Sequence, residues 1–259
     1  MATRYNPKIV TDGLAFCVDW SNPRCYQGAV GTEAWNDISL NPVGTNGHNQ
    51  SSGDGPTYTS DGNVAYYNYT RSNTERHRTT ESGGASILSK MGHSGSGVSA
   101  FPYSIEALFR LTSLPVSNST ADRFTIIGNT EVNKGFGIQV RNNGTNVQLQ
   151  IGARNRGSHT IQEDLVTNKW YHAVIARDGA ADLSATINFY MNGVLINTRD
   201  GSGRAVVDYP SNTTVQIGHG GSATGAMDGD IALVRIYSKQ LSTSEVAQNY
   251  NALKGRFGL

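Results

Sequence analysis

The sequence contains little cysteine and no cysteine pattern that would organise a small fold. Only two of the 259 residues are cysteine, Cys17 and Cys25, and their spacing fits neither a disulfide framework nor a zinc site. Cys17 lies within an apolar stretch, where a buried free thiol is the simplest expectation. A Cys17–Cys25 bridge is the alternative, and the sequence leaves both open.

Charge and long apolar runs are also scarce. Charged residues make up 16% of the chain, the formal net charge is +1, and no run of Lys or Arg stands out. The chain therefore lacks the field that draws a protein to nucleic acid, so we expect no nucleic-acid partner. No window approaches the ~20 apolar residues of a membrane span, which excludes membrane insertion. Residues 1–7 carry no signal-peptide pattern, so we expect synthesis in a cytoplasm and a soluble product.

Glycine is abundant, with 30 residues, and 37% of the chain is hydrophobic. Glycine at this level without a Gly-X-Y period suits many turns between short strands. Alternating apolar and polar residues then predict strands along most of the chain: Gly13–Val18, Val64–Thr70, Tyr103–Leu111, Phe124–Ile127, Phe136–Val140, Val147–Ile151, Trp170–Arg177, Ile187–Met191, Val194–Ile196, Val215–Ile217 and Ile231–Tyr237. Asn192-Gly193 supplies a type I′ turn between two of them.

Roughly ten to thirteen short strands with no helix between them exclude a βαβ fold. Antiparallel strands must then enclose a core, so we predict an all-β antiparallel sandwich of jelly-roll type, formed by residues 1–259 as a single domain. The segments 21–61 and 71–100 are polar and are predicted to be loops. The second contains a basic cluster of Arg71, Arg76, His77 and Arg78, which could meet an acidic partner or be solvated.

One helix is predicted, at residues 242–254. Ser242 and Glu245 form a capping box, flanked by Leu241 and Val246 at the hydrophobic-staple positions. Gly255 then supplies a stop, which leaves residues 256–259 as a short tail. Its apolar residues Phe257 and Leu259 could pack on the chain's own sandwich or on a neighbouring subunit.

An ordered set of short motifs runs through the second half of the chain: Phe101–Ala107, Lys169–Val174, Phe189–Gly193, Val215–Gly218 and Asp228–Tyr237. In order and spacing this set resembles the laminin-G-like, concanavalin-A-like superfamily. The opening, Gly13–Asp19 with Asn22-Pro23 and Trp35–Asp37, is similar to the start of laminin-G-like proteins of tailed phages. The ending, Leu241–Leu259, is similar to C-termini of virion proteins in phages of marine cyanobacteria. These resemblances imply a component of a virus particle.

The superfamily includes glycosidases, which need two carboxylates on one face about 5–5.5 Å apart. Glu106 stands alone between Ile105 and Ala107, and no same-face pair accompanies it. We therefore expect no enzymatic activity.

The resemblance also implies a calcium ion held by Asp side chains and loop carbonyls. The matching positions are Asp19, Asp37, Asp228 and Asp230, although Asp37 and Asp228 could instead cap turns. For glycan binding the sequence offers aromatic side chains near Asn residues, chiefly Tyr26, Trp35 and Tyr67. The alternative is that these aromatic residues fill the core.

The sequence thus favours a non-enzymatic structural protein on the surface of a phage virion, as a fibre, a head decoration or an adhesion module. Expected partners are other virion proteins, host-surface glycans and further copies of the chain in a homo-oligomer. A soluble carbohydrate-binding lectin is the alternative function, and a glycoside hydrolase is the third.

Overall fold

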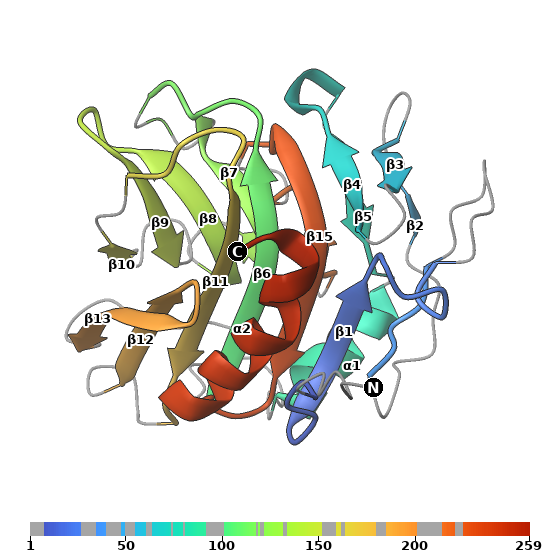
Figure 1. Cartoon of the computed structure of the whole chain (residues 1–259), viewed down its shortest axis with the longest axis vertical. Coiled ribbons are helices and arrows are strands. Elements are labelled where there is room, and N and C mark those ends of the chain that lie inside the picture. The colour runs from blue at the N-terminus through green and yellow to red at the C-terminus, as the bar shows by residue number, and fades with distance from the viewer. Residues whose placement is uncertain are drawn as a thin grey trace, which may run out of the picture.

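The computed structural model describes residues 8–26, 35–39, 48–49, 55–60, 64–73, 75–79, 81–91, 101–117, 119, 122–131, 134–151, 159–161, 164–179, 185–200, 214–220 and 225–259. These residues form two antiparallel β-sheets that lie one in front of the other (Figure 1). The predicted antiparallel sandwich is therefore confirmed.

The eight-stranded sheet has the order β13-β12-β11-β6-β15-β4-β3, and β1 also pairs with β15. Its strands are β1 (Leu14–Asp19), β3 (Thr57–Ser60), β4 (Ala65–Tyr69), β6 (Tyr103–Leu111), β11 (Trp170–Arg177), β12 (Thr186–Met191), β13 (Val194–Asp200) and β15 (Gly229–Tyr237). One end of β15 pairs with β4 and the other with β1, while its opposite edge pairs with β6. Asn192 and Gly193, both at positive φ, form the predicted turn between β12 and β13.

The seven-stranded sheet has the order β10-β9-β8-β7-β14-β5-β2. Its strands are β2 (His48–Asn49), β5 (His77–Arg78), β7 (Phe124–Glu131), β8 (Lys134–Asn142), β9 (Val147–Ile151), β10 (His159–Ile161) and β14 (Gln216–Ile217). β2, β5 and β10 fall in segments without a clear alternation of apolar and polar residues, so they were not predicted from the sequence. The main hydrophobic core lies between the two sheets and takes the inward residues of both, such as Ile105, Phe109, Ile138 and Leu149.

Helix α2 (Thr243–Phe257) lies across the outer face of the eight-stranded sheet, in front of β6, β11 and β15 (Figure 1). It begins at Ser242 with both hydrogen bonds of the predicted capping box. It ends later than predicted. The helix continues through Gly255, and Gly258 at φ 64° forms the cap. Phe257 is therefore a helical residue that packs against Trp170 on the chain's own sheet, and it does not belong to a free tail.

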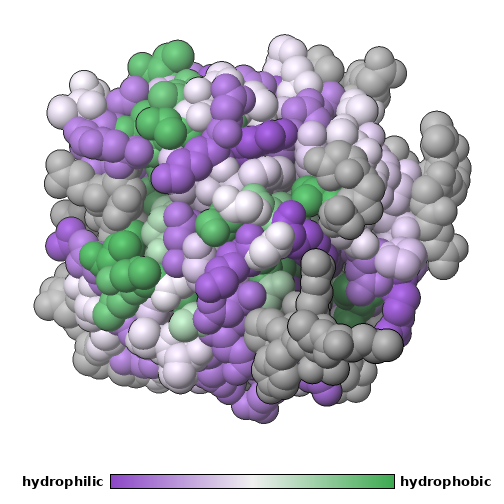
Figure 2. Space-filling view, in the orientation of Figure 1, coloured by the Kyte–Doolittle hydropathy of each residue, from purple (hydrophilic) through white to green (hydrophobic). Residues whose placement is uncertain are grey.

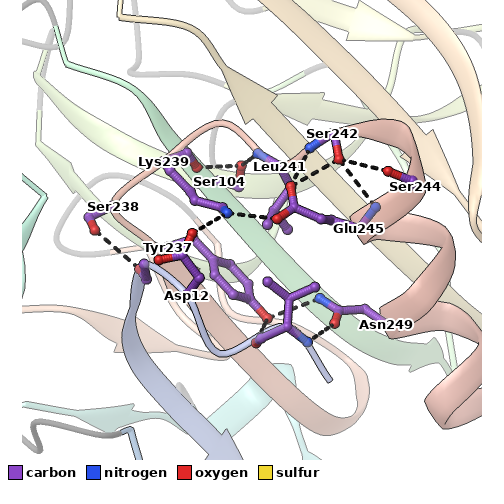
Figure 3. A network of polar contacts seen from close by, with 12 residues as sticks. Asp12, Ser104, Tyr237, Ser238, Lys239, Leu241, Ser242, Ser244, Glu245 and Asn249 are labelled. Carbon is purple, nitrogen blue, oxygen red and sulfur yellow. Dashed lines mark hydrogen bonds and ion pairs between the residues drawn. The ribbon is translucent and has the colours of Figure 1, made fainter. Parts of the chain in front are cut away.

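The segment that leads into α2 is fixed by polar contacts (Figure 3). The Ser104 hydroxyl donates to the Lys239 carbonyl at 2.9 Å and accepts from the Leu241 amide at 2.8 Å. The Lys239 ammonium group lies 2.6 Å from both Asp12 and Glu245. These contacts join the N-terminal segment, β6 and the helix start on one face of the molecule.

A second helix was not predicted. Helix α1 (Glu81–Lys90) occupies part of the segment expected to be a loop, and a 3₁₀ turn covers Arg71–Asn73. Ile87, Leu88 and Met91 are buried in the main core, so packing holds α1 although its sequence contains two glycines. No helix in the described residues is both long and apolar enough to cross a membrane.

The surface over α2 is largely hydrophilic, whereas a hydrophobic patch lies over β12 and β13 toward the left of Figure 2. Val194 and Leu195, which follow the hairpin turn, are the exposed large hydrophobic residues of these two strands, at 63% and 41% exposure.

Candidate functional site

The outer face of the seven-stranded sheet carries a row of amide side chains. Gln139 pairs with Thr125 on one side and with Gln150 on the other, and Gln148 pairs with Arg141 on the adjoining strand. Their neighbours along the strands point into the core, so strand alternation places these polar residues outward. We call this set, together with Gln216 and Arg78 on β14 and β5, the amide face.

The amide face is buried yet only partly hydrogen-bonded. The Gln139 amide donates to the Thr125 hydroxyl at 3.2 Å, and the Gln148 carbonyl accepts from Arg141. Gln150 and Gln216 are 1% and 7% exposed, but their Oε1 atoms have no partner among the described residues. Buried acceptors are rarely left unpaired in native proteins, so these two oxygens call for a donor from outside the chain, such as water or a ligand hydroxyl.

Two glycines lie beside Gln216 on this face. The register aligns Arg78, Gln216, Gly128 and Gly137 across four neighbouring strands. A Cβ atom at Gly137 would lie 2.7 Å from the Ile127 carbonyl oxygen, so a side chain is excluded there. The backbone of β7 and β8 therefore carries no side chain next to the Gln216 amide and the Arg78 guanidinium group.

A separate polar network lies beneath α2. Glu106 is fully buried, and its carboxylate takes hydrogen bonds from His172, Arg235, Tyr237 and Asn249 at 2.8 to 3.3 Å. Burial alone would raise the pKa of Glu106, but the Arg235 charge and the His172 hydrogen bond outweigh it and hold that pKa below its usual value. Since α2 covers this carboxylate, Glu106 can reach no substrate.

The four aspartates proposed as calcium ligands are bonded by other groups of the chain. Asp19 accepts from Arg256 and from the Ser21 amide, and Asp37 accepts from the amides of Cys17 and Ser39. Asp228 accepts from the Arg71 amide and the Ser113 hydroxyl, and Asp230 accepts from Arg110 and Asn68. In the described part of the chain, no three His, Cys, Asp or Glu side chains gather to hold a metal ion. The four do not fit one calcium site, and calcium binding by the chain stays a prediction.

The three aromatic residues proposed for glycan binding lie in the core. Tyr26, Trp35 and Tyr67 are 7%, 2% and 0% exposed, and they pack edge-on with Trp20 and with one another. A buried ring offers no face to a sugar, so the alternative, that they fill the core, describes their place in this structure. Cys17 and Cys25 are free and buried, and burial raises the pKa of both thiols.

The amide face was missed as a site although its pattern was visible. Gln148 and Gln150 alternate with core residues, which predicts outward polar positions and nothing more. The distinguishing facts are the burial of the glutamines and their unpaired oxygens, and both depend on which strands are neighbours. No local signal in the sequence carries that information.

Comparisons with solved structures return receptor-binding domains of botulinum neurotoxins. The domain of the C/D mosaic serotype has a TM-score of 0.61 and 17% identity, over 93% of this chain and 51% of that one. The serotype D domain has a TM-score of 0.58 and 18% identity, over 93% of this chain and 52% of that one. A third structure, described as showing that cell entry of type C toxin depends on two ganglioside molecules, has a TM-score of 0.56 and 15% identity, over 88% and 50%. The chain thus spans about half the length of these neighbours, and the likeness concerns the fold.

No curated protein matches the chain. A family model described as the concanavalin A-like lectin/glucanases superfamily, of the third laminin-G type, matches residues 79–247. This match covers more than half of the chain, from just after β5 into α2, so it includes β7, β8, β9 and β14 of the amide face. The chain therefore belongs to the laminin-G-like group of the concanavalin A-like superfamily.

Proposed function

We propose that this chain is a non-catalytic recognition module on the surface of a phage particle, and that it binds host-surface glycans through the amide face. The observation that carries the proposal is the row of outward polar side chains on the seven-stranded sheet, in which Arg78 and Arg141 are half-buried and reach the surface beside the unpaired acceptors of Gln216 and Gln150. Glycan hydroxyl groups are donors of the kind that these oxygens lack, and amide side chains fix the orientation of a polar ligand.

The carboxylates of the chain support a binding role over a glycosidase. Retaining and inverting glycosidases both need two carboxylates that flank one bond. Within the described strands of the seven-stranded sheet, Glu131 is the one acidic residue, at the end of β7. Glu106 is sealed under α2 on the opposite side of the sandwich. Among its described residues, the amide face has no acid–base pair with which to cleave a sugar.

Two further lines support placement on a particle surface. The opening and the ending of the sequence are similar to proteins of tailed phages, as described above. The structural neighbours are receptor-binding domains, one solved in complex with rat synaptotagmin II and one described with gangliosides. These are properties of the neighbours, and we propose host-surface binding for this chain by analogy.

The test is a double variant, Gln150→Leu with Gln216→Leu, assayed on a glycan array. Leucine keeps the volume and removes both acceptors, so we expect about a tenfold loss of affinity for the best glycans. Stability should be unchanged or higher, because unpaired buried polar atoms are lost. Gln248→Leu is the matched control, since Gln248 is exposed on α2. Glycan binding equal in all three proteins would contradict the proposal.

The alternative of a free soluble lectin predicts the same glycan binding and differs in location. Mass spectrometry of purified virions separates the two, because a structural protein is present at a constant number of copies per particle. The expected homo-oligomer is tested by the mass of the chain in solution. Turnover of an algal polysaccharide to reducing sugar would support the third alternative, a hydrolase, and overturn the non-catalytic part of the proposal.

A further inference from the structure

Four arginines with buried or half-buried side chains are matched to carboxylates. Arg110 pairs with Asp230 at 2.6 Å, and Arg235 with Glu106 and Arg256 with Asp19 at 2.9 Å each. Arg71 pairs with Asp122. The fold therefore supplies a counter-charge to each of these four guanidinium groups.

Arg76 and Arg78 have no such carboxylate among the described residues. Both are half-buried, whereas Glu75, His77 and Thr79, which alternate with them, are buried. Alternation along this strand therefore puts the two guanidinium groups on one side, the outward side that Arg78 shares with Gln216. No ion pair joins either arginine to a carboxylate among the described residues, and the Arg76 Nε atom is buried without a partner.

His219 lies next to this pair. It follows β14 directly after Gly218, is 8% exposed, and its Nδ1 atom has no partner among the described residues. Burial, with a smaller contribution from the Arg76 charge, lowers the pKa of His219 to about 4, so the ring is neutral at pH 7. Burial and then the charge of Arg78 lower the pKa of Arg76. The register pairs Arg78 with Gln216, Arg76 lies two residues before Arg78, and His219 lies three residues after Gln216, so the four residues gather at one end of the sheet.

This arrangement is unfavourable in the free chain. Two like charges lie close together, both are partly desolvated, and no carboxylate offsets them. A bound anion would offset the repulsion between the two guanidinium groups and would also accept hydrogen bonds from their unpaired N–H donors. Arginine forks match the planar carboxylate and the tetrahedral sulfate equally well, through paired N–H···O contacts.

We infer that Arg76, Arg78, Gln216 and His219 form an anion subsite at the β5–β14 end of the amide face, which selects glycans bearing carboxylate or sulfate groups. The inference rests on the proposed function and adds the ligand class to it. The two arginines would take the anionic substituent. Gln216 and His219 would contact hydroxyl groups of the same or the adjoining sugar.

The test uses three immobilised polysaccharides of different charge: polygalacturonate, dextran sulfate and neutral dextran. We expect the whole chain to bind one or both anionic polymers at about 150 mM salt at least tenfold more tightly than dextran. Arg76→Gln with Arg78→Gln should reduce that affinity by tenfold or more. Arg78→Lys, which keeps the charge and loses the fork, should reduce it severalfold. Arg199→Gln, which removes an exposed arginine from β13 on the other sheet, is the control and should change little.

The outcomes are distinguishable. Polygalacturonate binding identifies the carboxylate as the ligand group, and dextran sulfate binding identifies the sulfate. Equal loss in Arg199→Gln and in the double variant would show a general charge effect and overturn the subsite. Equal binding of neutral and anionic polymers would also overturn it while leaving the proposed glycan binding intact. Failure to bind any polymer or any glycan on the array would contradict the proposed function itself. An unchanged or raised Tm of the double variant, expected because unpaired charges are removed, verifies folding in each case.

Discussion

At the scale of single residues, the sequence around Glu106 does not indicate its structural role. The pattern around it is that of a half-buried strand with one outward carboxylate. In the structure that carboxylate is completely buried and joins β6, β11, β15 and α2 through His172, Arg235 and Asn249. Buried charges are tolerated when they are paired and fully hydrogen-bonded, and here the pairing partners come from 66 to 143 residues away along the chain.

We expect Glu106→Gln to destabilise the chain by about 3–5 kcal/mol, because it leaves the buried Arg235 without a counter-charge. Glu245→Gln is the matched control. Glu245 binds Lys239 near the surface, so that change should cost less than about 1 kcal/mol. Urea denaturation of the three proteins measures both values. Similar losses in the two variants would show that the Glu106 network contributes no more than a surface ion pair.

A second residue-scale prediction concerns acid. His77 is fully buried among Trp20, Trp35 and Tyr67, with the Tyr69 hydroxyl 2.8 Å from Nδ1, and burial lowers the pKa of His77 to about 3. The unfolded chain therefore binds a proton below pH 6.5 that the folded chain does not. The stability due to this group is complete above pH 6.5 and falls by about 1.4 kcal/mol per pH unit as the pH drops toward 3. Unfolding free energies at pH 7 and pH 5 should differ less in His77→Gln than in the wild type. The same difference in both proteins would contradict the assignment.

At the scale of elements, long strands were predictable and short elements were not. β6, β11 and β12 each place alternate residues in a core, so periodicity alone predicts them almost to the residue. β2 and β5 have two residues each, too few to show an alternation of apolar and polar residues. α1 depends on tertiary packing, which its own sequence does not indicate. The end of α2 was misplaced for a related reason. Burial of Phe257 against Trp170 extends the helix through Gly255, which local propensity would make a stop.

The two glycines near the end of α2 should respond in opposite ways to the same substitution. Gly255 is an exposed helical residue with open space around its Cα, so Gly255→Ala should stabilise the chain by about 0.5–1 kcal/mol. Gly258 adopts φ 64° as the cap, so Gly258→Ala should destabilise it by about 1 kcal/mol. Thermal unfolding measures both, and a stabilising Gly258→Ala would indicate that the helix ends elsewhere.

Phe257 provides the test of whether the C-terminal residues belong to the chain's own core. The side chain is 7% exposed and packs with Leu108, Leu233 and Leu253. We expect Phe257→Ala to cost about 3 kcal/mol and to leave the mass in solution unchanged. A small change in Tm together with a loss of self-association would instead place Phe257 at an interface between subunits.

At the scale of the whole molecule, the fold class was predictable and the placement of its sites was not. Aromatic and acidic residues near the start of the chain were natural candidates for binding, yet long-range packing buries the rings and supplies the carboxylates with protein donors. The amide face, in contrast, exists only because β5 and β14, from distant segments, align with β7, β8 and β9. Strand alternation decides which side of its own strand a side chain occupies. Only the assembled sheets decide which residues meet.

Removal of divalent metal is the whole-molecule test of the calcium prediction. An ion that binds only the folded chain at 100 times its Kd would add about 2.7 kcal/mol of stability, a shift of several degrees in Tm. Since Asp19, Asp37, Asp228 and Asp230 are engaged by protein donors, we expect the Tm in 1 mM calcium and in excess EDTA to agree within about a degree. A fall of several degrees in EDTA, with calcium found by elemental analysis, would establish a site elsewhere in the chain.

The position of β15 has a consequence for how the chain is made. This strand, residues 229–237, joins β6 on one side to β1 and β4 on the other, so three strands synthesised earlier are completed by a later one. Until β15 has left the ribosome, β1 and β4 have no partner in it, and the face that receives α2 is incomplete. Pairings so distant in sequence form slowly. The eight-stranded sheet therefore forms only after β15 is made, and shortened chains that end before β15 should expose open strand edges and aggregate.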